Sequence, residues 1–109
     1  MFFDTDDLLK GIDETDIEFR SKNNPILPHL RHTYVFENEE KVDIAIAKYI
    51  DALIVYYDSH GFNHLNPYHR STKHNHYSSV IIYNERGAMV FFIAGNYERY
   101  TVICDVEIF

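Results

Sequence analysis

Several common features are scarce in this chain of 109 residues, and each absence excludes a class of protein. The single cysteine, Cys104, excludes an internal disulfide and fits a reducing compartment. Four glycines supply no glycine-rich phosphate loop. Apolar runs such as residues 88–94 are too short to cross a bilayer, and no signal peptide opens the chain. We therefore expect a cytoplasmic protein.

Acidic residues are also missing from one stretch of the chain. Residues 59–79 contain no Asp or Glu, whereas the rest of the chain contains all 17 acids. Five of the seven histidines fall within this stretch, namely His60, His64, His69, His74 and His76. The formal charge of −7 repels nucleic acid phosphates and anionic lipid, and it favours encounter with basic partners.

The composition and the hydrophobic pattern predict one α+β domain that spans residues 1–109. With 46% apolar residues the chain can form a core, and its length leaves no room for a second one. The clearest element is an amphipathic helix from Glu39 to Ser59, capped by Asn38 and stopped by Gly61. One face of this helix is apolar, and the opposite face carries carboxylates.

Alternating apolar residues predict a strand over 30–36 and three more over 77–83, 88–94 and 99–109. A short helix is expected near residues 4–10. The predicted order is α-β-α-β-β-β, a mainly antiparallel four-stranded sheet with the long helix packed on one face. Residues 60–77 read as a long His-rich loop within the domain, and loops of this length often bind or gate.

Three functions can be considered for this loop. The first is metal binding by His60 with His64 or by His74 with His76, but Gly61 interrupts the first pair and no Cys pair is present. We therefore expect neither a metal nor another cofactor. The second is metal-free RNA or phosphodiester cleavage, with an acid and a base drawn from four histidines and a cation for the phosphate. Its candidate residues are His64, His69, His74, His76 and Lys73, with Arg70 as an alternative cation.

The third function is contact with another protein. In the loop it would use Tyr68, His69 and Arg70. A second candidate surface is acidic, because carboxylates crowd the first 18 residues and the outer side of the long helix. Its candidate residues are Asp6, Asp7, Asp13, Glu14, Asp16, Glu18, Asp43 and Asp51, together with the apolar neighbours Ile44 and Val55.

These observations favour a small binding protein over an enzyme. The leading hypothesis is a cytoplasmic inhibitor that neutralises a basic partner, such as a nuclease toxin or another nucleic-acid-handling protein. The analogy is at the level of class, with immunity proteins and phage inhibitors of host defence. The alternative is the His-dependent phosphodiesterase. No direct contact with nucleic acid or membrane is expected, and the sequence leaves a homodimer open.

Overall fold

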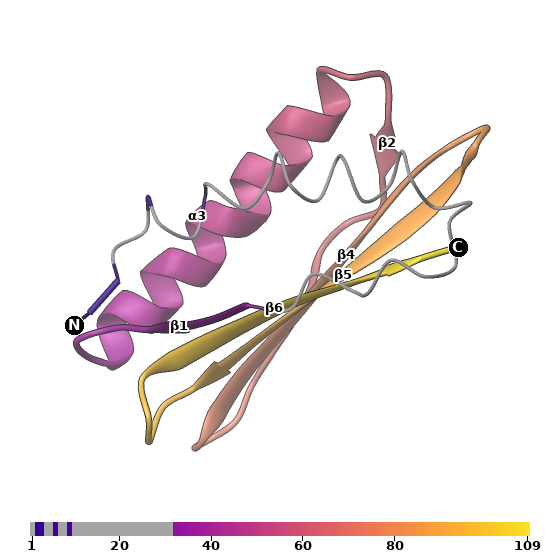
Figure 1. The fold of residues 1–109 in the computed structure, drawn as a ribbon. Coiled ribbons are helices and arrows are strands. Elements are labelled where there is room, and N and C mark those ends of the chain that lie inside the picture. Colours follow the sequence, from indigo (N-terminus) through magenta and orange to yellow (C-terminus); the bar gives the residue numbers. More distant parts are fainter. Residues whose placement is uncertain (1, 4–5, 7–8, 10–31) are drawn as a thin grey trace.

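The computed structural model describes residues 2–3, 6, 9 and 32–109 of the chain, and it has an α+β fold (Figure 1). The prediction of an α+β fold with an antiparallel sheet is confirmed, but the sheet has six strands rather than four. The expected helix near residues 4–10 lies almost wholly outside the described residues. The elements are β1 (His32–Val35), α3 (Glu39–Asp58), β2 (Asn63–His64), β3 (Tyr68–Ser71), β4 (Asn75–Asn84), β5 (Gly87–Asn96) and β6 (Thr101–Ile108).

The helix α3 begins and ends close to the predicted residues. The side chain of Asn38 accepts a hydrogen bond from the Lys41 backbone N–H at 3.0 Å, which caps the first turn. At the other end Gly61 has a φ of +83°, a left-handed conformation that glycine adopts without strain. Among the described residues, no helix is long and apolar enough to cross a membrane.

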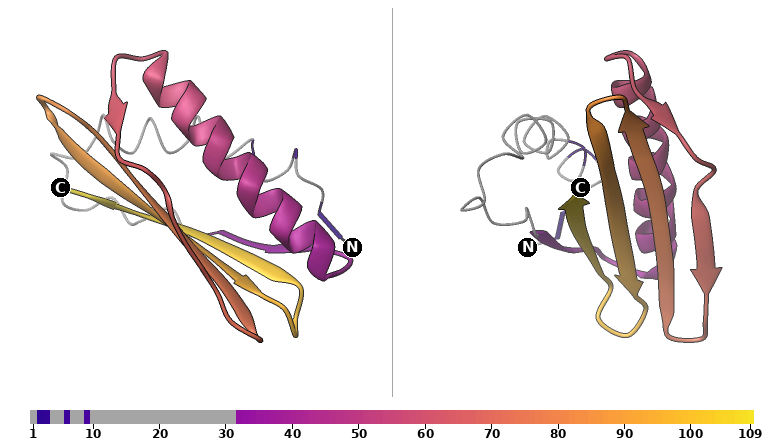
Figure 2. Two further views of the ribbon diagram at one scale, coloured as in Figure 1. Left: turned by 180° about the vertical axis from the view of Figure 1, so that it is seen from behind. Right: turned by 90° about the vertical axis from the view of Figure 1, so that its right-hand side faces the viewer.

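The sheet has the order β1-β6-β5-β4-β2, and β3 also pairs with β4. The strands β4 and β5 form a long antiparallel hairpin in register from Asn75 opposite Asn96 to Asn84 opposite Gly87. Alternate residues of the three long strands are buried beneath α3, which crosses this side of the sheet (Figures 1 and 2). The buried residues of these strands are Ser78, Val80, Ile82, Met89, Phe91, Ile93, Gly95, Val102, Cys104 and Val106.

The expected loop over residues 60–77 is instead built largely of strands. Both β2 and β3 pair antiparallel with β4 and together extend the sheet beyond it. Phe62 anchors the connection from α3, because its buried ring meets the Tyr57 ring edge to face with centroids 5.3 Å apart. Three histidines of this stretch, His64, His69 and His76, are therefore held at defined positions of the sheet.

The helix approaches the sheet closely at Gly95. A Cβ atom placed there would lie 2.8 Å from Ile46 Cδ1 and 2.8 Å from Val42 Cγ1. Glycine is thus required on β5 because the inward side of α3 fills the space of a side chain.

We predict that Gly95→Ala destabilises the protein by about 1–3 kcal/mol, since one added methyl group overpacks this contact. The free energy of unfolding in urea measures the change. Ile46→Val removes the clashing Cδ1 atom, so it should cost less stability in the Gly95→Ala background than in the wild type. Equal costs in both backgrounds would contradict the close approach.

Candidate functional site

Five polar side chains meet beside the first half of α3 and form a continuous network, here called the His69–His76 cluster. Asp43 Oδ1 lies 3.0 Å from His76 Nδ1 and accepts a hydrogen bond from Tyr97 Oη at 2.7 Å. On the other side of the ring, His76 Nε2 lies 3.2 Å from Ser78 Oγ and 3.3 Å from His69 Nδ1. Ser78 Oγ is also 2.7 Å from His69 Nδ1.

Regular structure positions each member of the cluster. His76 and Ser78 are two apart on β4, so both point to the side of the sheet that α3 covers. His69 lies directly opposite Ser78 in the register of β3 with β4. Asp43 lies in the second turn of α3, and Tyr97 follows directly after β5.

One assignment of protons gives a favourable role to every member of the cluster. The Asp43 carboxylate accepts, so His76 Nδ1 donates to it and His76 Nε2 is left as an acceptor. The Ser78 hydroxyl then donates to His76 Nε2 and accepts from the Nδ1–H group of His69. The carboxylate thus fixes the tautomer and the orientation of His76.

Burial differs sharply along the cluster. Ser78 is buried and the His76 side chain is only 13% exposed, whereas His69 is exposed. Burial, and then the hydrogen bond to Asp43, raises the pKa of Tyr97 above its usual value, although a hydrogen bond with Ser71 lowers it in part. The cluster therefore joins a nearly buried centre to an exposed imidazole.

Chemically, the order Asp43, His76, Ser78 is that of an oriented base next to a hydroxyl group. His69 and His76 together also offer the two imidazoles that acid–base catalysis requires. The same contacts tie β3 and β4 to α3, which is a structural role that needs no substrate.

The structure divides the predicted catalytic residues into separate places. Of the four histidines only His69 and His76 come together. His64 Nδ1 lies 3.1 Å from Asp58 near the end of α3, and His74 Nδ1 lies 2.8 Å from Glu98. The separation of histidines from carboxylates along the chain does not hold in space at three positions, because His64, His74 and His76 each contact an acid from elsewhere in the chain.

The predicted phosphate ligands lie away from the two joined imidazoles. Lys73 is exposed in the turn between β3 and β4. Arg70 pairs in register with Tyr77, on the side of the sheet opposite His69. Tyr68 lies on the same side as Arg70, so the predicted contact residues of this segment are divided between two faces. Within the described part of the chain, no group of three or more His, Cys, Asp or Glu residues is arranged to hold a metal ion.

The acidic surface is described only in part. Asp6 is exposed. The other predicted N-terminal residues, Asp7, Asp13, Glu14, Asp16 and Glu18, lie outside the described residues. On the helix Asp43 belongs to the His69–His76 cluster, whereas Asp51 is exposed. Ile44 and Val55 are also exposed, by 42% and 69% respectively.

Six exposed residues at helical spacing form one stripe, here called the α3 outer face. It contains three carboxylates interspersed with apolar residues, and the exposed Lys41 and Lys48 lie along its edge. At 1.5 Å per residue the stripe runs for about 27 Å. Its members are Glu40, Ile44, Ala47, Asp51, Val55 and Asp58.

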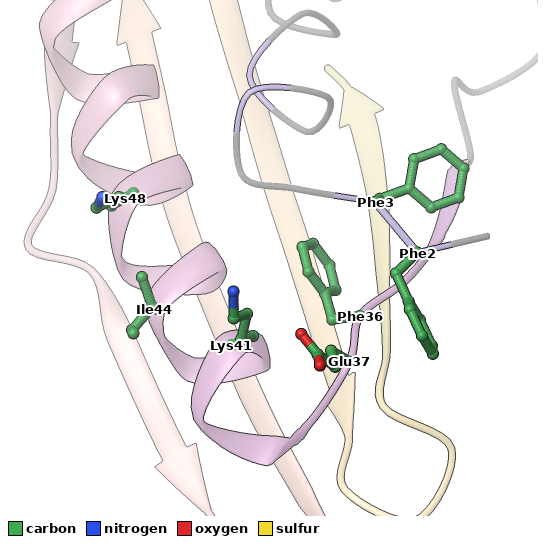
Figure 3. Close-up of a pocket in the computed structure, with 7 residues that line it drawn as sticks. All are labelled: Phe2, Phe3, Phe36, Glu37, Lys41, Ile44 and Lys48. Carbon is green, nitrogen blue, oxygen red and sulfur yellow. The ribbon is translucent and has the colours of Figure 1, made fainter.

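A pocket of about 260 Å³ lies beside this face (Figure 3). Ile44 and two lysines, Lys41 and Lys48, line it from α3, and Phe2 and Phe3 line it from the N-terminal segment. The Phe3 backbone N–H donates to the Val35 carbonyl at 2.7 Å, so this segment is held against β1. The remaining lining residues are Phe36 and Glu37.

Ser78 and Tyr97 were not among the predicted site residues. Ser78 could have been found from its alternation with His76 on a strand, whereas no pattern marks Tyr97. Cys104 is buried, and burial raises the pKa of its thiol to about 12, so this thiol is protonated and unreactive near neutral pH.

Comparison with protein families, with characterised proteins and with solved structures finds no match for this chain.

We predict that Asp43→Asn lowers the pKa of Tyr97, because the charge and the hydrogen bond of Asp43 both raise it. Part of the shift should persist, since burial is the larger cause. A pH titration of ¹³C-labelled tyrosine by NMR measures the change. Because the pKa of Tyr97 is raised in the folded state, the neutral Tyr97 hydroxyl adds to the free energy of unfolding below about pH 10. This contribution is lost as the pH rises through the folded pKa. An unchanged pKa in Asp43→Asn would contradict the contact.

Proposed function

We propose that the protein is a small cytoplasmic inhibitor that binds a basic partner, such as a nuclease or another nucleic-acid-handling protein, through the α3 outer face. The observation that carries this proposal is the alternation of exposed apolar side chains and carboxylates along five turns of one helix. Val55, 69% exposed, lies between the exposed carboxylates of Asp51 and Asp58. Apolar side chains rimmed by charge are typical of contact surfaces.

The charge of the chain supports a basic partner. A net charge of −7 attracts cationic surfaces over several ångströms and accelerates encounter. Asp6 and the predicted acids Asp7, Asp13, Glu14, Asp16 and Glu18 are part of this net charge. On the helix, Asp58 contacts His64 and Asp43 contacts His76, so Glu40 and Asp51 are the acids best placed for docking.

We predict that Glu40→Lys combined with Asp51→Lys slows association with the partner by about tenfold or more. The partner is first captured from an extract of the native host and identified, and its association rate is then measured at about 50 to 500 mM salt. The rate should fall as salt rises. Glu85→Lys combined with Glu107→Lys makes the same change of net charge outside the α3 outer face and is the matched control. An acidic partner, or equal losses in both variants, would overturn the proposal.

A second candidate function is metal-free phosphodiester cleavage, which the contact between His69 and His76 favours. Asp43 orients His76, and the exposed His69 ring is the member of the pair that a substrate can reach. The predicted cation Lys73 lies in the exposed turn between β3 and β4, outside the His69–His76 cluster.

If this activity exists, His69→Ala and His76→Ala should each lower RNA cleavage by about a hundredfold, because each removes one half of the acid–base pair. Cleavage should survive a chelator and show a bell-shaped dependence between about pH 5 and pH 8. His64→Ala, which removes only the contact with Asp58, is the control and should stay active. A wild-type protein that cleaves no member of a mixed RNA panel would exclude the enzyme.

A further inference from the structure

The side of the sheet that faces away from α3 carries an unusual number of apolar side chains. This open face is visible in the right-hand view of Figure 2, where the helix lies behind the strands. A strand that meets water on one side normally alternates apolar with polar residues. On β5 four of the five outward residues are instead apolar, namely Ala88, Val90, Phe92 and Ala94. Phe92 is 45% exposed there, which points to a surface that is covered by a partner.

The register of β4 with β5 gives this face a regular pattern of large and small side chains. Paired residues share a face, and in three of the five outward pairs a large side chain lies opposite a small one. The larger member lies on β4 in two of these pairs and on β5 in the third. The outward pairs are Asn75 with Asn96, Tyr77 with Ala94, Ser79 with Phe92, Ile81 with Val90, and Tyr83 with Ala88.

This pattern is complementary to itself. A twofold axis parallel to the strands, between β4 and β5, would stack two open faces so that each residue of β4 covers the paired position on β5 of the second copy. Phe92 of one copy would then cover Ser79 of the other, and Tyr77 would cover Ala94. Large side chains would meet small ones in each of these rows, as close packing of two sheets about 10 Å apart requires.

A hollow of about 230 Å³ marks the place where the large side chains would enter. It is lined by the small residues Ser79 and Ala94 and by the exposed rings of Tyr68, Tyr77 and Phe92. In the stacked arrangement, the Phe92 ring of the second copy lies over Ser79 in this hollow.

The charged residues of the open face also fit the twofold arrangement. Arg70 lies on β3, next to Tyr77, and Asp105 lies on β6, next to Phe92. The twofold axis places β3 of one copy over β6 of the other, so each arginine comes within one row of the other copy's aspartate. Two opposite charges would therefore meet at each side of the interface.

We propose that the open face binds a second copy of this chain and forms an isologous homodimer by stacking the two sheets. This interface lies on the opposite side of the sheet from the α3 outer face and does not depend on the proposed function. Single-stranded nucleic acid, which also stacks on exposed rings, fits this face less well. Asp105 and Glu107 both lie on it, and the net charge of −7 opposes a polyanion.

The size pattern can be tested by exchanging the two members of one pair. Ser79→Phe alone places two rings in one row of the interface, and Phe92→Ser alone leaves that row unfilled, so each should raise the dissociation constant of the dimer about tenfold or more. The double variant S79F/F92S restores one large and one small residue in that row. It should return the dissociation constant to within about threefold of the wild type. Sedimentation equilibrium of the full chain from micromolar to millimolar concentration measures the dimer.

Arg70→Glu and Asp105→Arg give a second test that leaves the sizes on β4 and β5 unchanged. Each single change should weaken the dimer, and the double variant R70E/D105R should restore it. Circular dichroism and thermal unfolding verify that each variant is folded, and Val55→Asp on α3 is the control that should not alter dimerisation. A wild-type monomer at millimolar concentration would overturn the proposal. So would a dimer that folded open-face variants leave intact, or double variants that do not recover. If the protein stays monomeric and a short oligonucleotide shifts the NMR signals of the open-face rings, the face would be assigned to nucleic acid instead.

Discussion

Burial of the inward side of α3 against β4, β5 and β6 is the interaction on which the rest of the structure depends. At Gly95 the helix comes so close that Val42 and Ile46 fill the place of a side chain. This contact fixes the rotation of the helix about its axis, so the opposite side of α3 is exposed along its length. It also directs Asp43 toward the start of β4, where it meets His76. The polar cluster and the α3 outer face are both consequences of one packing contact.

Periodicity in the sequence was sufficient to predict the elements that have a buried side. The helix was expected from Glu39 to Ser59 and ends at Asp58, and β4 and β5 extend slightly beyond the expected strands. The strands β2 and β3 were missed because Asn, His, Arg and Ser show no apolar alternation there. They form because the edge of β4 offers them backbone partners, and such pairing leaves little trace in composition. Tertiary context decided their structure.

The candidate site was predictable in its residue types but not in its arrangement. Histidines were expected to matter, yet the meeting of His69 with His76 requires the register of β3 on β4, and the approach of Asp43 requires the rotation of α3. For the same reason, residues 59–79 lack acids in the sequence but do not lack acidic neighbours in the folded protein. In space, carboxylates from the helix and from the turn after β5 lie against His64, His74 and His76. Distances in sequence do not report such contacts.

The position of β1 has a consequence for the order in which the chain folds. The strands β3 to β6 are joined by hairpins between neighbours, whereas β1 pairs with β6, at the far end of the chain. During synthesis β1 therefore leaves the ribosome well before β6, and its own ladder cannot form until β6 has been made. Closing so long a loop is slow in comparison with hairpin formation. The seam between β1 and β6 should thus be the last part of the sheet to close, after α3 has docked on the three long strands.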